Sequence, residues 1–440
     1  MASTAVAQVW MWGRMVGAVA EEDSGVVTFE YDPAFTRSGL EISPFKLPLS
    51  LRAPVTFPEL QRVASFAGLP GVLADALPDR FGNAVIKRFF ENSGRPGAAL
   101  SPVQKLLYMG NRSMGALEFR PPIDGRRAKE DESIVIASLV EQARKIVEGN
   151  VEVAVPEIMR VGSSAGGARP KAVILLNKVK KTVRSGFAHA KPGDEHWIIK
   201  FDGVGELDHP NQNPQVFNRI EFVYWLMAKQ AGIYVDYIEP LRERGLTHLL
   251  VKRFDRAGNS GKVHMHSLAG LEHIDYNVPG AYSYEQYLRA VLRLNLGYDA
   301  LEEAYRRAVF NIMARNQDDH VKNLSFLMDK NGHWSLSPAY DLTYAHGAGY
   351  TRVHQMSLGG RQDNFTPEQL ERVAREFGLK HAGAHVIEQV HEALLDWTKL
   401  AKEHDVPLKI IKDVAADMRL ELYRPKRKST RKTGMARKVG

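Results

Sequence analysis

The first 120 residues contain short runs in which apolar and polar positions alternate. The runs at 9–19 and 26–31 have the two-residue period of strands with one buried face, and residues 84–90 have the pattern of a helix. Turns rich in glycine and proline separate these runs. The pattern predicts a small α+β domain, which we place at residues 1–125.

The next region begins with a polar stretch, DGRRAKEDE at 124–132, which is typical of a linker or an exposed loop. A helical pattern at 134–148 follows. From residue 163 the chain shows a glycine-rich turn, a strand, a loop, a strand, a helix and a strand, which is the order of elements in an ATP-binding small lobe. We place that lobe at 126–260, with strands at 172–176, 196–201 and 247–254 and a helix at 216–231.

The third region, placed at 261–423, is expected to form a helical lobe. Apolar residues recur at i, i+3, i+4 and i+7 from Leu301 to Met313, which predicts a helix with one continuous buried face. The helix ends at a polar cluster, RNQDDHVKN at 315–323. Two strands, at 324–328 and 334–336, are expected to follow as a hairpin.

Composition limits the class of protein. The chain has 440 residues and is 44% hydrophobic, enough for a sizeable core and several domains. Its net charge of +8 comes from a tail at 424–440, expected to be disordered, which has eight basic residues and no acidic one. No apolar run reaches the roughly 20 residues of a spanning helix and no signal peptide is recognisable, so we expect a cytoplasmic protein. The absence of cysteine excludes disulfides and thiolate metal sites.

The segment RVGSSAGGARPK at 160–171 places three glycines and small neighbours before an apolar strand. Such a turn lets backbone N–H groups approach phosphate oxygens, and Lys171 adds a positive charge. The pattern is equally typical of a surface hairpin, and it lacks the spacing of a Walker A loop. This segment alone leaves both interpretations open.

Lys200 lies within an apolar strand, where a buried lysine needs a partner. Glu221 projects beside the apolar stripe of the helix about twenty residues later. Protein kinases use such a pair to hold a lysine on the ATP phosphates, although a chance pair fits the pattern as well. The end of the strand at 247–254 is a candidate for the hinge against which adenine lies, and Asp255 after it is a candidate turn cap.

Asp318 and Asn323 have the spacing of the kinase catalytic loop, in which the aspartate accepts the substrate hydroxyl proton and an asparagine five positions later binds magnesium. Asp341 follows eighteen residues after Asn323, where the second magnesium carboxylate is expected. Oxygen ligands and a carboxylate base suit phosphoryl transfer because the charge on the γ-phosphate must be neutralised. Lys322 is placed to reach the transferred phosphate.

Two other interpretations of this segment remain. Aspartate and asparagine commonly occupy turns and helix ends, so the four residues Asp318, Asp319, Asn323 and Asp341 could have that structural role. His320 with the aspartates is a candidate hydrolytic metal site, but the segment holds one histidine and no His-x-x-x-His or His-x-His pattern.

Five segments together resemble the HipA family of toxin kinases. They are GSSAGGARPK at 162–171, WIIK at 197–200, VKRFDR at 251–256, NQDDHVKN at 316–323 and PAYDL at 338–342. LPLS at 47–50, ALPD at 76–79 and MGAL at 114–117 extend the likeness to the N-terminal region. The resemblance implies an α+β, protein kinase-like two-lobed fold with a HipA-type N-terminal subdomain and an all-α C-terminal lobe.

The resemblance also implies an activity and roles for particular residues. The chain would transfer the γ-phosphate of ATP to serine or threonine, with Asp318 as catalytic base and Lys322 beside it. Asn323 and Asp341 would bind Mg²⁺, and Glu221 would support Lys200. The residues implied to contact ATP are Gly166, Gly167, Ala168, Lys171, Lys200, Lys252, Phe254 and His320.

Members of this family carry a serine in the glycine loop whose autophosphorylation silences the kinase. Ser163 fits that position best. Ser164 competes with it, because this chain has two adjacent serines and GGARPK where the family usually has GAQEK.

The resemblance implies three partners: a small HipB-like helix-turn-helix antitoxin, operator DNA bound through the antitoxin complex, and a protein substrate such as an aminoacyl-tRNA synthetase, particularly the glutamyl enzyme. A DNA-associated co-repressor with little catalysis is the alternative, because the basic tail suits contacts to phosphates. A small-molecule kinase is a third hypothesis, since a fold does not decide the acceptor.

Overall fold

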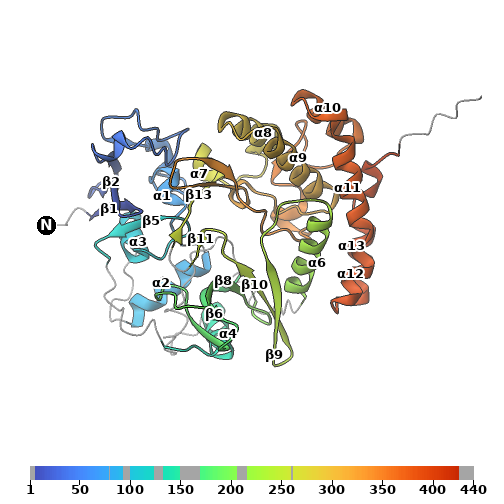
Figure 1. Ribbon diagram of the computed structural model, residues 1–440, viewed down its shortest axis with the longest axis horizontal. Coiled ribbons are helices and arrows are strands. Elements are labelled where there is room, and N and C mark those ends of the chain that lie inside the picture. The colour runs from blue at the N-terminus through green and yellow to red at the C-terminus, as the bar shows by residue number, and fades with distance from the viewer. Residues whose placement is uncertain are drawn as a thin grey trace, which may run out of the picture.

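The computed structural model describes residues 5–78, 80–92, 100–122, 132–148, 169–205, 216–258 and 261–425. Three regions follow one another along the chain: an N-terminal domain, a small lobe built on a second sheet, and a larger, mainly helical lobe (Figure 1). Among the described residues, no helix is long and apolar enough to cross a bilayer.

The N-terminal domain is built on a five-stranded antiparallel sheet in the order β4-β3-β2-β1-β5. Alternation along β1 buries Ala7, Val9 and Met11 on one face. Trp12 and Gly13, with φ angles of 51° and 79°, form the tight turn that joins β1 to β2. The strands are β1 (Ala5–Met11), β2 (Arg14–Glu21), β3 (Val27–Tyr31), β4 (Val55–Thr56) and β5 (Leu117–Arg120).

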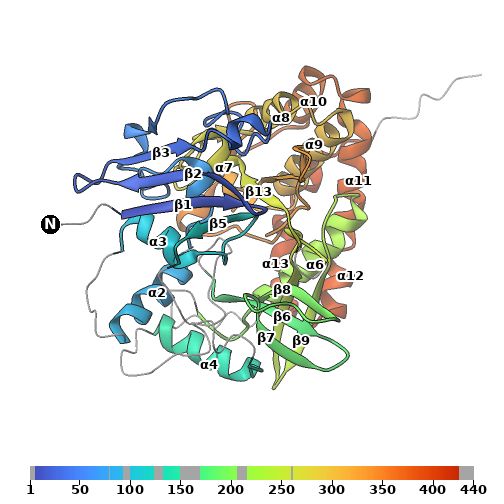
Figure 2. The same cartoon turned by 60° about the vertical axis from the view of Figure 1, so that its left-hand side comes forward.

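Three helices accompany this sheet: α1 (Gly71–Ala74), α2 (Arg80–Asn92) and α3 (Pro102–Met109). A capping box between Ser101 and Gln104 begins α3, which packs on β1 and β5. α2 contains the predicted helix at 84–90, and it contacts α4 (Ile136–Val147) of the small lobe, as Figure 2 shows. Helix α2 therefore contributes to the small-lobe core.

The small lobe is a five-stranded sheet in the order β7-β6-β8-β10-β9. Its core joins α2 and α4 to the face of the sheet that carries Trp197 and Ile199. The strands are β6 (Lys171–Asn177), β7 (Thr182–Ser185), β8 (Asp194–Lys200), β9 (Ile238–Glu243) and β10 (Leu246–Lys252). The strands predicted around 172–176, 196–201 and 247–254 are all present.

Helix α6 (Phe217–Gln230) links the small lobe to the large one. It contacts β9 and β10, while Ile220, Val223 and Met227 belong to the core of the large lobe. The hydroxyl of its Tyr224 donates to the carbonyl oxygen of Ala314 at 2.6 Å. This helix is therefore anchored beside the end of α9 (Tyr298–Met313), just before the polar cluster.

The large lobe is mainly helical, but the expectation of an all-α lobe needs a correction. A three-stranded antiparallel sheet, β13-β15-β16, lies within it, and β14 (Tyr282–Ser283) pairs with β17 (Met356–Ser357). Strands β15 (Ser325–Met328) and β16 (Trp334–Leu336) are the expected hairpin, whereas β13 (His264–Ser267) was missed because its partner β15 lies about sixty residues away. The helices are α7 (Leu268–Glu272), α8 (Tyr284–Arg293), α9, α10 (Pro367–Glu376), α11 (Ala384–Leu395), α12 (Trp397–Glu403) and α13 (Leu408–Asp417).

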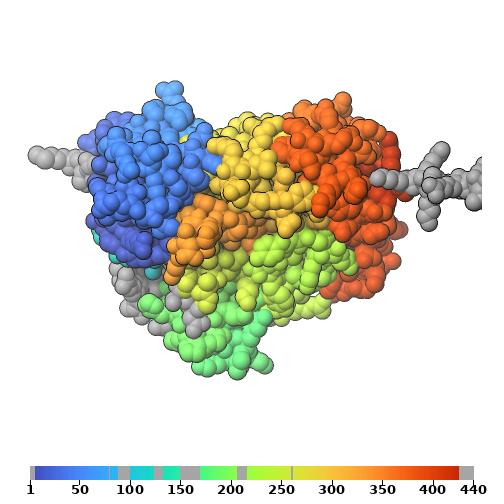
Figure 3. All heavy atoms as spheres, turned by 45° about the horizontal axis from the view of Figure 1, so that its top comes forward, coloured from blue at the N-terminus to red at the C-terminus, as the bar shows by residue number. Residues whose placement is uncertain are grey.

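The N-terminal domain packs directly against the large lobe, as Figure 3 shows where the blue residues meet the yellow and orange ones. Met328 of β15 is a member of the N-terminal core, and Trp334 packs against that core. Helix α1 contacts α7, and the indole N–H of Trp12 donates to the carbonyl oxygen of Lys262 at 2.8 Å. The sheet β13-β15-β16 thus connects the N-terminal domain with the polar cluster at 315–323.

Candidate active site

The predicted catalytic loop begins where α9 ends. Arg315 has a φ of +58°, a conformation that ends the helix. The side-chain amide of Asn316 donates to Asn311 Oδ1 at 2.9 Å, which ties Asn316 to the last turns of α9. The backbone N–H of Gln317 then donates to the carbonyl oxygen of Ala345 at 3.0 Å. These bonds fix the backbone just before the predicted base.

The loop brings Asp318 and Asn323 together, as their spacing predicts. The side-chain amide of Asn323 donates to the carbonyl oxygen of Asp318 at 3.0 Å, and its backbone N–H donates to the carbonyl oxygen of His320 at 2.9 Å. Because the first bond uses the amide nitrogen, the oxygen Oδ1 of Asn323 is the atom that can serve as a ligand.

The carboxylate side chain of Asp318 is 30% exposed. Its Oδ1 has no hydrogen-bond partner among the described residues, and His320 Nε2 lies 3.5 Å away. Burial raises the pKa of Asp318, and the charge of Asp341 raises it further, while His320 and Arg169 oppose that shift. This carboxylate is a better base than an exposed aspartate.

Asp319, the neighbouring carboxylate, has a different role. It is buried, and its oxygens accept from the Tyr284 hydroxyl at 2.6 Å, from His354 Nδ1 at 2.7 Å and from the backbone N–H of Gln355 at 2.7 Å. Arg419 Nη1 lies 2.8 Å from His354 Nε2, and because a guanidinium only donates, Nε2 accepts and Nδ1 carries the proton toward Asp319.

This network makes Asp319 a structural anchor for the segment around His354. Asp319, one of the three aspartates of the alternative hydrolytic metal site around His320, already uses its oxygens as hydrogen-bond acceptors. Among the described residues, no group of three or more His, Asp or Glu side chains has a metal-binding arrangement. A Mg²⁺ site needs fewer protein ligands, since phosphates and water complete it.

A second cluster forms around Lys200. Its Nζ donates to Glu221 Oε1 at 2.5 Å and also to Asp341 Oδ1. The predicted pair of strand lysine and helix glutamate is therefore present, and the lysine is buried between two carboxylates. Burial by itself lowers the pKa of Lys200, but the charges of Asp341 and Glu221 outweigh it and raise that pKa.

Asp341 is held in an uncommon conformation, with a φ of +53°. Burial raises its pKa, but Lys200 and then Lys171 outweigh burial and lower the pKa to about 2. Lys171 is buried and is the cross-strand partner of Lys200, so both lysines project from the same face of the sheet. Lys171, Lys200, Glu221 and Asp341 therefore form one charged cluster at the junction of the two lobes.

The catalytic loop contains a concentration of unsatisfied polar atoms. Among the described residues, buried side-chain atoms without a hydrogen-bond partner include Asn316 Oδ1, Gln317 Oε1, Asp318 Oδ1 and His320 Nδ1. Buried polar groups in native proteins are normally paired, so such a cluster points to a ligand, an ion or water. The oxygen donors of Asn323 and Asp341 are of the type that Mg²⁺ prefers, and the residues therefore fit the predicted cation.

Lys322 is placed differently from the expectation that it reaches the transferred phosphate directly. Its Nζ donates to Asp75 Oδ1 of the N-terminal domain at 2.5 Å, and its side chain is 24% exposed. Its carbonyl oxygen accepts from the Tyr340 hydroxyl at 2.8 Å. The lysine thus lies in the catalytic loop but is bonded to a residue that the motif search did not single out.

His320 and Phe254 border the site. The His320 ring lies 5.4 Å from that of Tyr276, beside Asp318, and Phe254 lies 5.7 Å from the ring of Tyr340. Lys252 does not join them through its side chain, which donates to Glu195 at 3.0 Å. Because Lys252 is the register partner of Trp197, it projects from the face of the sheet opposite to Lys200.

Asp255 is buried rather than a simple turn cap. It accepts from Arg253 Nε at 2.9 Å and from the backbone N–H of Gly115 at 2.7 Å. The end of the candidate hinge is therefore tied to the N-terminal domain. The predicted residues Ser163, Ser164, Gly166, Gly167 and Ala168 lie outside the residues that the structure describes.

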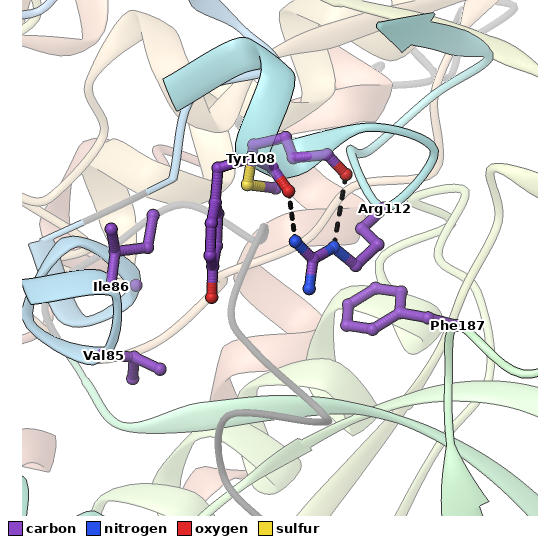
Figure 4. A pocket seen from close by; sticks show the side chains of 7 residues that line it. Val85, Ile86, Tyr108, Arg112 and Phe187 are labelled. Carbon is purple, nitrogen blue, oxygen red and sulfur yellow. Dashed lines mark hydrogen bonds between the residues drawn. The ribbon is translucent and has the colours of Figure 1, made fainter. Parts of the chain in front are cut away.

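Two concavities lie away from this constellation. One, about 10 Å³ in volume, lies between α2 and α3, where Val85 and Tyr108 face Arg112 and Phe187 (Figure 4). It has room for about one water molecule. The other, about 480 Å³, is a groove between α4 and β9 whose lining includes Arg144 and Glu243. Neither contains any of the predicted catalytic residues.

Comparison with known families agrees with this geometry. Residues 7–120 match the HipA N-terminal domain, and residues 163–398, more than half of the chain, match the HipA-like C-terminal domain. The chain belongs to the HipA family. The resemblance to the HipA family is therefore confirmed for the N-terminal region and for the region that holds the catalytic motifs.

A solved HipA structure matches this chain at low sequence identity. The structure of HipA in a complex of the Shewanella oneidensis HipA–HipB toxin–antitoxin system with its operator DNA has a TM-score of 0.63 and 18% identity, covering 95% of this chain and 96% of that one. This match establishes the HipA fold, including its kinase-like lobes. The Helicobacter pylori proinflammatory kinase CtkA has a TM-score of 0.32 and 11% identity, over 52% of this chain and 89% of that one, which is too low to support an argument.

A Haemophilus influenzae protein provisionally described as a kinase is 33% identical over 100 residues. That segment covers 21% of this chain and 29% of the relative. The similarity is therefore local.

Three contacts near the candidate site were not indicated by the sequence motifs: Asp75 with Lys322, Asp319 with His354, and Asp255 with Gly115. Asp75 directly precedes the ALPD segment and Gly115 lies within MGAL, two segments that carry the family resemblance but indicate no contact. The apolar residues before Asp75 indicate that this aspartate is buried, but they do not indicate which distant group it binds.

Proposed function

We propose that this chain is an ATP- and Mg²⁺-dependent protein kinase of the toxin type that phosphorylates serine or threonine. The observation that carries the proposal is the convergence of two groups: the Lys200–Glu221–Asp341 cluster, and the loop that holds Asp318 against Asn323. This combination of a paired lysine, an unpaired carboxylate oxygen and oxygen ligands suits phosphoryl transfer.

Each residue has a distinct task in this proposal. Bound ATP with Mg²⁺ would supply the γ-phosphoryl group and the cation that neutralises its charge. Asn323 Oδ1 and the Asp341 carboxylate would hold the cation, while Lys200, kept charged by its two carboxylates, would bind phosphate oxygens. The hydroxyl proton of the acceptor passes to Asp318, whose raised pKa suits a general base.

The acceptor and the regulation are also proposals. Family membership favours a protein acceptor, with an aminoacyl-tRNA synthetase as the target class that the resemblance implies. Ser163, or its neighbour Ser164, is the proposed site of silencing autophosphorylation. A HipB-like antitoxin and operator DNA are the proposed partners, because the fold match extends over nearly the whole chain of a HipA from such a complex.

Intact-mass and phosphopeptide analysis after incubation with Mg-ATP tests the kinase proposal. Wild-type protein is expected to gain phosphate, and Asp318→Ala, incubated identically, is expected to gain none. Phosphate on Ser163 or Ser164 in the wild type alone would support both the chemistry and the regulatory site. Equal incorporation in the two proteins would refute the role of Asp318.

A co-repressor function is a compatible second candidate, favoured by the basic tail. The structure describes only Arg424 and Pro425 of that tail, and Arg424 donates to Glu368 at 2.5 Å. Deletion of residues 426–440 therefore removes seven basic residues and keeps this ion pair. If the tail binds DNA, the deletion weakens operator binding with the antitoxin and lowers its salt dependence. Unchanged binding would leave the tail without this role.

A further inference from the structure

The carboxylate of Asp75 is surrounded by donors that belong to the large lobe. Its Oδ2 accepts from His266 Nδ1 and from the backbone N–H of Ser267, each at 2.7 Å. Its Oδ1 accepts from the Ser267 hydroxyl at 2.6 Å and from Lys322 Nζ at 2.5 Å. A residue of the N-terminal domain is thus built into the edge of the catalytic loop.

Two glycines allow this approach. A Cβ atom on Gly71 would lie 2.0 Å from the carbonyl oxygen of Gly270, and one on Gly270 would lie 2.6 Å from Asp75 Oδ2. The backbone N–H of Gly71 donates to His273 Nε2 at 2.9 Å. Helices α1 and α7 are therefore in backbone contact, and a larger residue at either glycine would displace Asp75.

The orientation of Asp75 is fixed by a chain of buried side chains. Ser43 Oγ lies 3.0 Å from His266 Nε2, whose Nδ1 binds Asp75. The order serine, histidine, aspartate matches that of hydrolytic triads, but Ser43 and His266 are both 0% exposed, so no substrate can reach them. This arrangement serves to hold the carboxylate, and burial of Asp75 is compensated by Lys322 and His266, which lower its pKa.

Lys322 is the member of this network that belongs to the catalytic loop. It lies between His320 and Asn323, and its backbone is bonded to Tyr340, the neighbour of Asp341. A free lysine side chain samples many rotamers, and ordering it carries an entropic cost. Because Nζ is bonded to Asp75, the Lys322 side chain is already ordered before any ligand binds.

We propose that Asp75 is a positioning residue of the kinase site: it orders the side chain of Lys322, which directly precedes Asn323 in the catalytic loop, so that the N-terminal domain supports the phosphoryl-transfer centre. The inference rests on the proposed function. Through the Asp75 side chain, the N-terminal domain would then influence the rate of phosphate transfer as well as any binding of partners.

A double-mutant cycle tests this inference on the full-length chain, using the initial rate of phosphate incorporation from labelled Mg-ATP. Asp75→Asn is expected to lower the maximal rate about 10-fold while the ATP concentration at half-maximal rate changes less than about 2-fold. In a Lys322→Ala background, the same substitution is expected to cause no further loss, because Asp75 acts through Lys322.

Ser65→Ala is the matched control. It removes the bond from the Ser65 hydroxyl to Asp275 Oδ1, 3.0 Å long, from the same domain interface, and it should leave the maximal rate unchanged. Circular dichroism of each variant checks folding. If Asp75→Asn does not fold, Ser267→Ala replaces it in the cycle, since it removes one donor from the Asp75 oxygen that binds Lys322, and the expected loss is about 3-fold.

The outcomes separate the two proposals. If the wild type shows no transfer that depends on Asp318, the proposed function fails. If the wild type is active and Asp75→Asn keeps the full rate, or loses the same factor with and without Lys322, only the positioning role is overturned.

Discussion

Two lysine clusters border the candidate active site, and they differ in what they connect. Lys200 joins the small lobe to α6 and to the large lobe through Glu221 and Asp341, whereas Lys322 joins the large lobe to the N-terminal domain through Asp75. Both lysines are ion-paired within about 3 Å. The first lysine is shared by two carboxylates, and the second shares one carboxylate with uncharged donors such as the Ser267 hydroxyl.

The difference indicates that a lysine–carboxylate pair can contribute strongly to the free energy of unfolding at one position and weakly at another. Removing Lys200 leaves the buried Glu221 and the partly exposed Asp341 without the cation that they share. Removing Lys322 leaves one carboxylate that still accepts from His266 and Ser267. The predictions below test this contrast.

The largest effect is expected for Lys200→Met. Glu221 and Asp341 lose the cation that binds both, and breaking a buried ion pair in this way costs about 3–5 kcal/mol of the free energy of unfolding. Urea denaturation measures that loss. Lys178→Met is the control, because Lys178 is 45% exposed and pairs with Glu239 at the surface, so its removal should cost at most about 1 kcal/mol.

Lys322→Met should cost less, about 1–3 kcal/mol, because the remaining donors still satisfy Asp75. The same urea experiment compares the two substitutions directly. A loss equal to or larger than that of Lys200→Met would contradict the contrast between the clusters.

Asp318 has no lysine partner among the described residues, so its substitution should raise the free energy of unfolding and not lower it. Its raised pKa means that the folded chain binds the proton more tightly than the unfolded chain, so stability falls as the pH rises above the ordinary carboxyl pKa. Asp318→Asn should therefore stabilise the fold at pH 7 by about 1 kcal/mol while abolishing phosphate transfer. Thermal denaturation from pH 3 to 8 should show this gain disappearing at the acid end.

Asp341 provides the comparison for that experiment. Its pKa is lowered to about 2, so its contribution to stability is present above the ordinary carboxyl pKa and is lost as the pH falls toward 2. Asp341→Asn should thus destabilise the fold at pH 7. If both aspartate variants shift stability in the same direction, the opposite environments assigned to them are wrong.

The smallest effect is expected for Tyr340→Phe, which removes a link between the clusters. The Tyr340 hydroxyl binds the carbonyl oxygen of Lys322 at 2.8 Å and Ser325 at 2.6 Å, while the next residue, Asp341, binds Lys200. Loss of this hydroxyl should cost about 1 kcal/mol, measured by urea denaturation. A loss above about 3 kcal/mol would indicate that the clusters are coupled much more strongly than one hydroxyl explains.

The comparison also shows where sequence analysis succeeded. The spacing of Asp318 and Asn323 within one loop predicted their contact, and the order of strand and helix predicted the pairing of Lys200 with Glu221, 21 residues apart. Hydrophobic period located strands β1, β2 and β3 of the N-terminal sheet, strands β6, β8 and β10 of the small-lobe sheet, and helix α9, whereas β4, β5, β7 and β9 were not predicted. These features depend on neighbours along the chain, which local patterns of apolar and polar residues report.

Other contacts depended on the tertiary structure alone. Asp75 and Lys322 are 247 residues apart, and nothing in the local pattern of either residue indicates the other. The same holds for β13, whose pairing with β15 places a sheet inside a lobe expected to be all-helical. The sequence by itself determined the HipA-type elements and the candidate catalytic residues. The backbone contact of Gly71 with Gly270 decided that the N-terminal domain reaches the catalytic loop, because only packing brings such distant segments within hydrogen-bond distance.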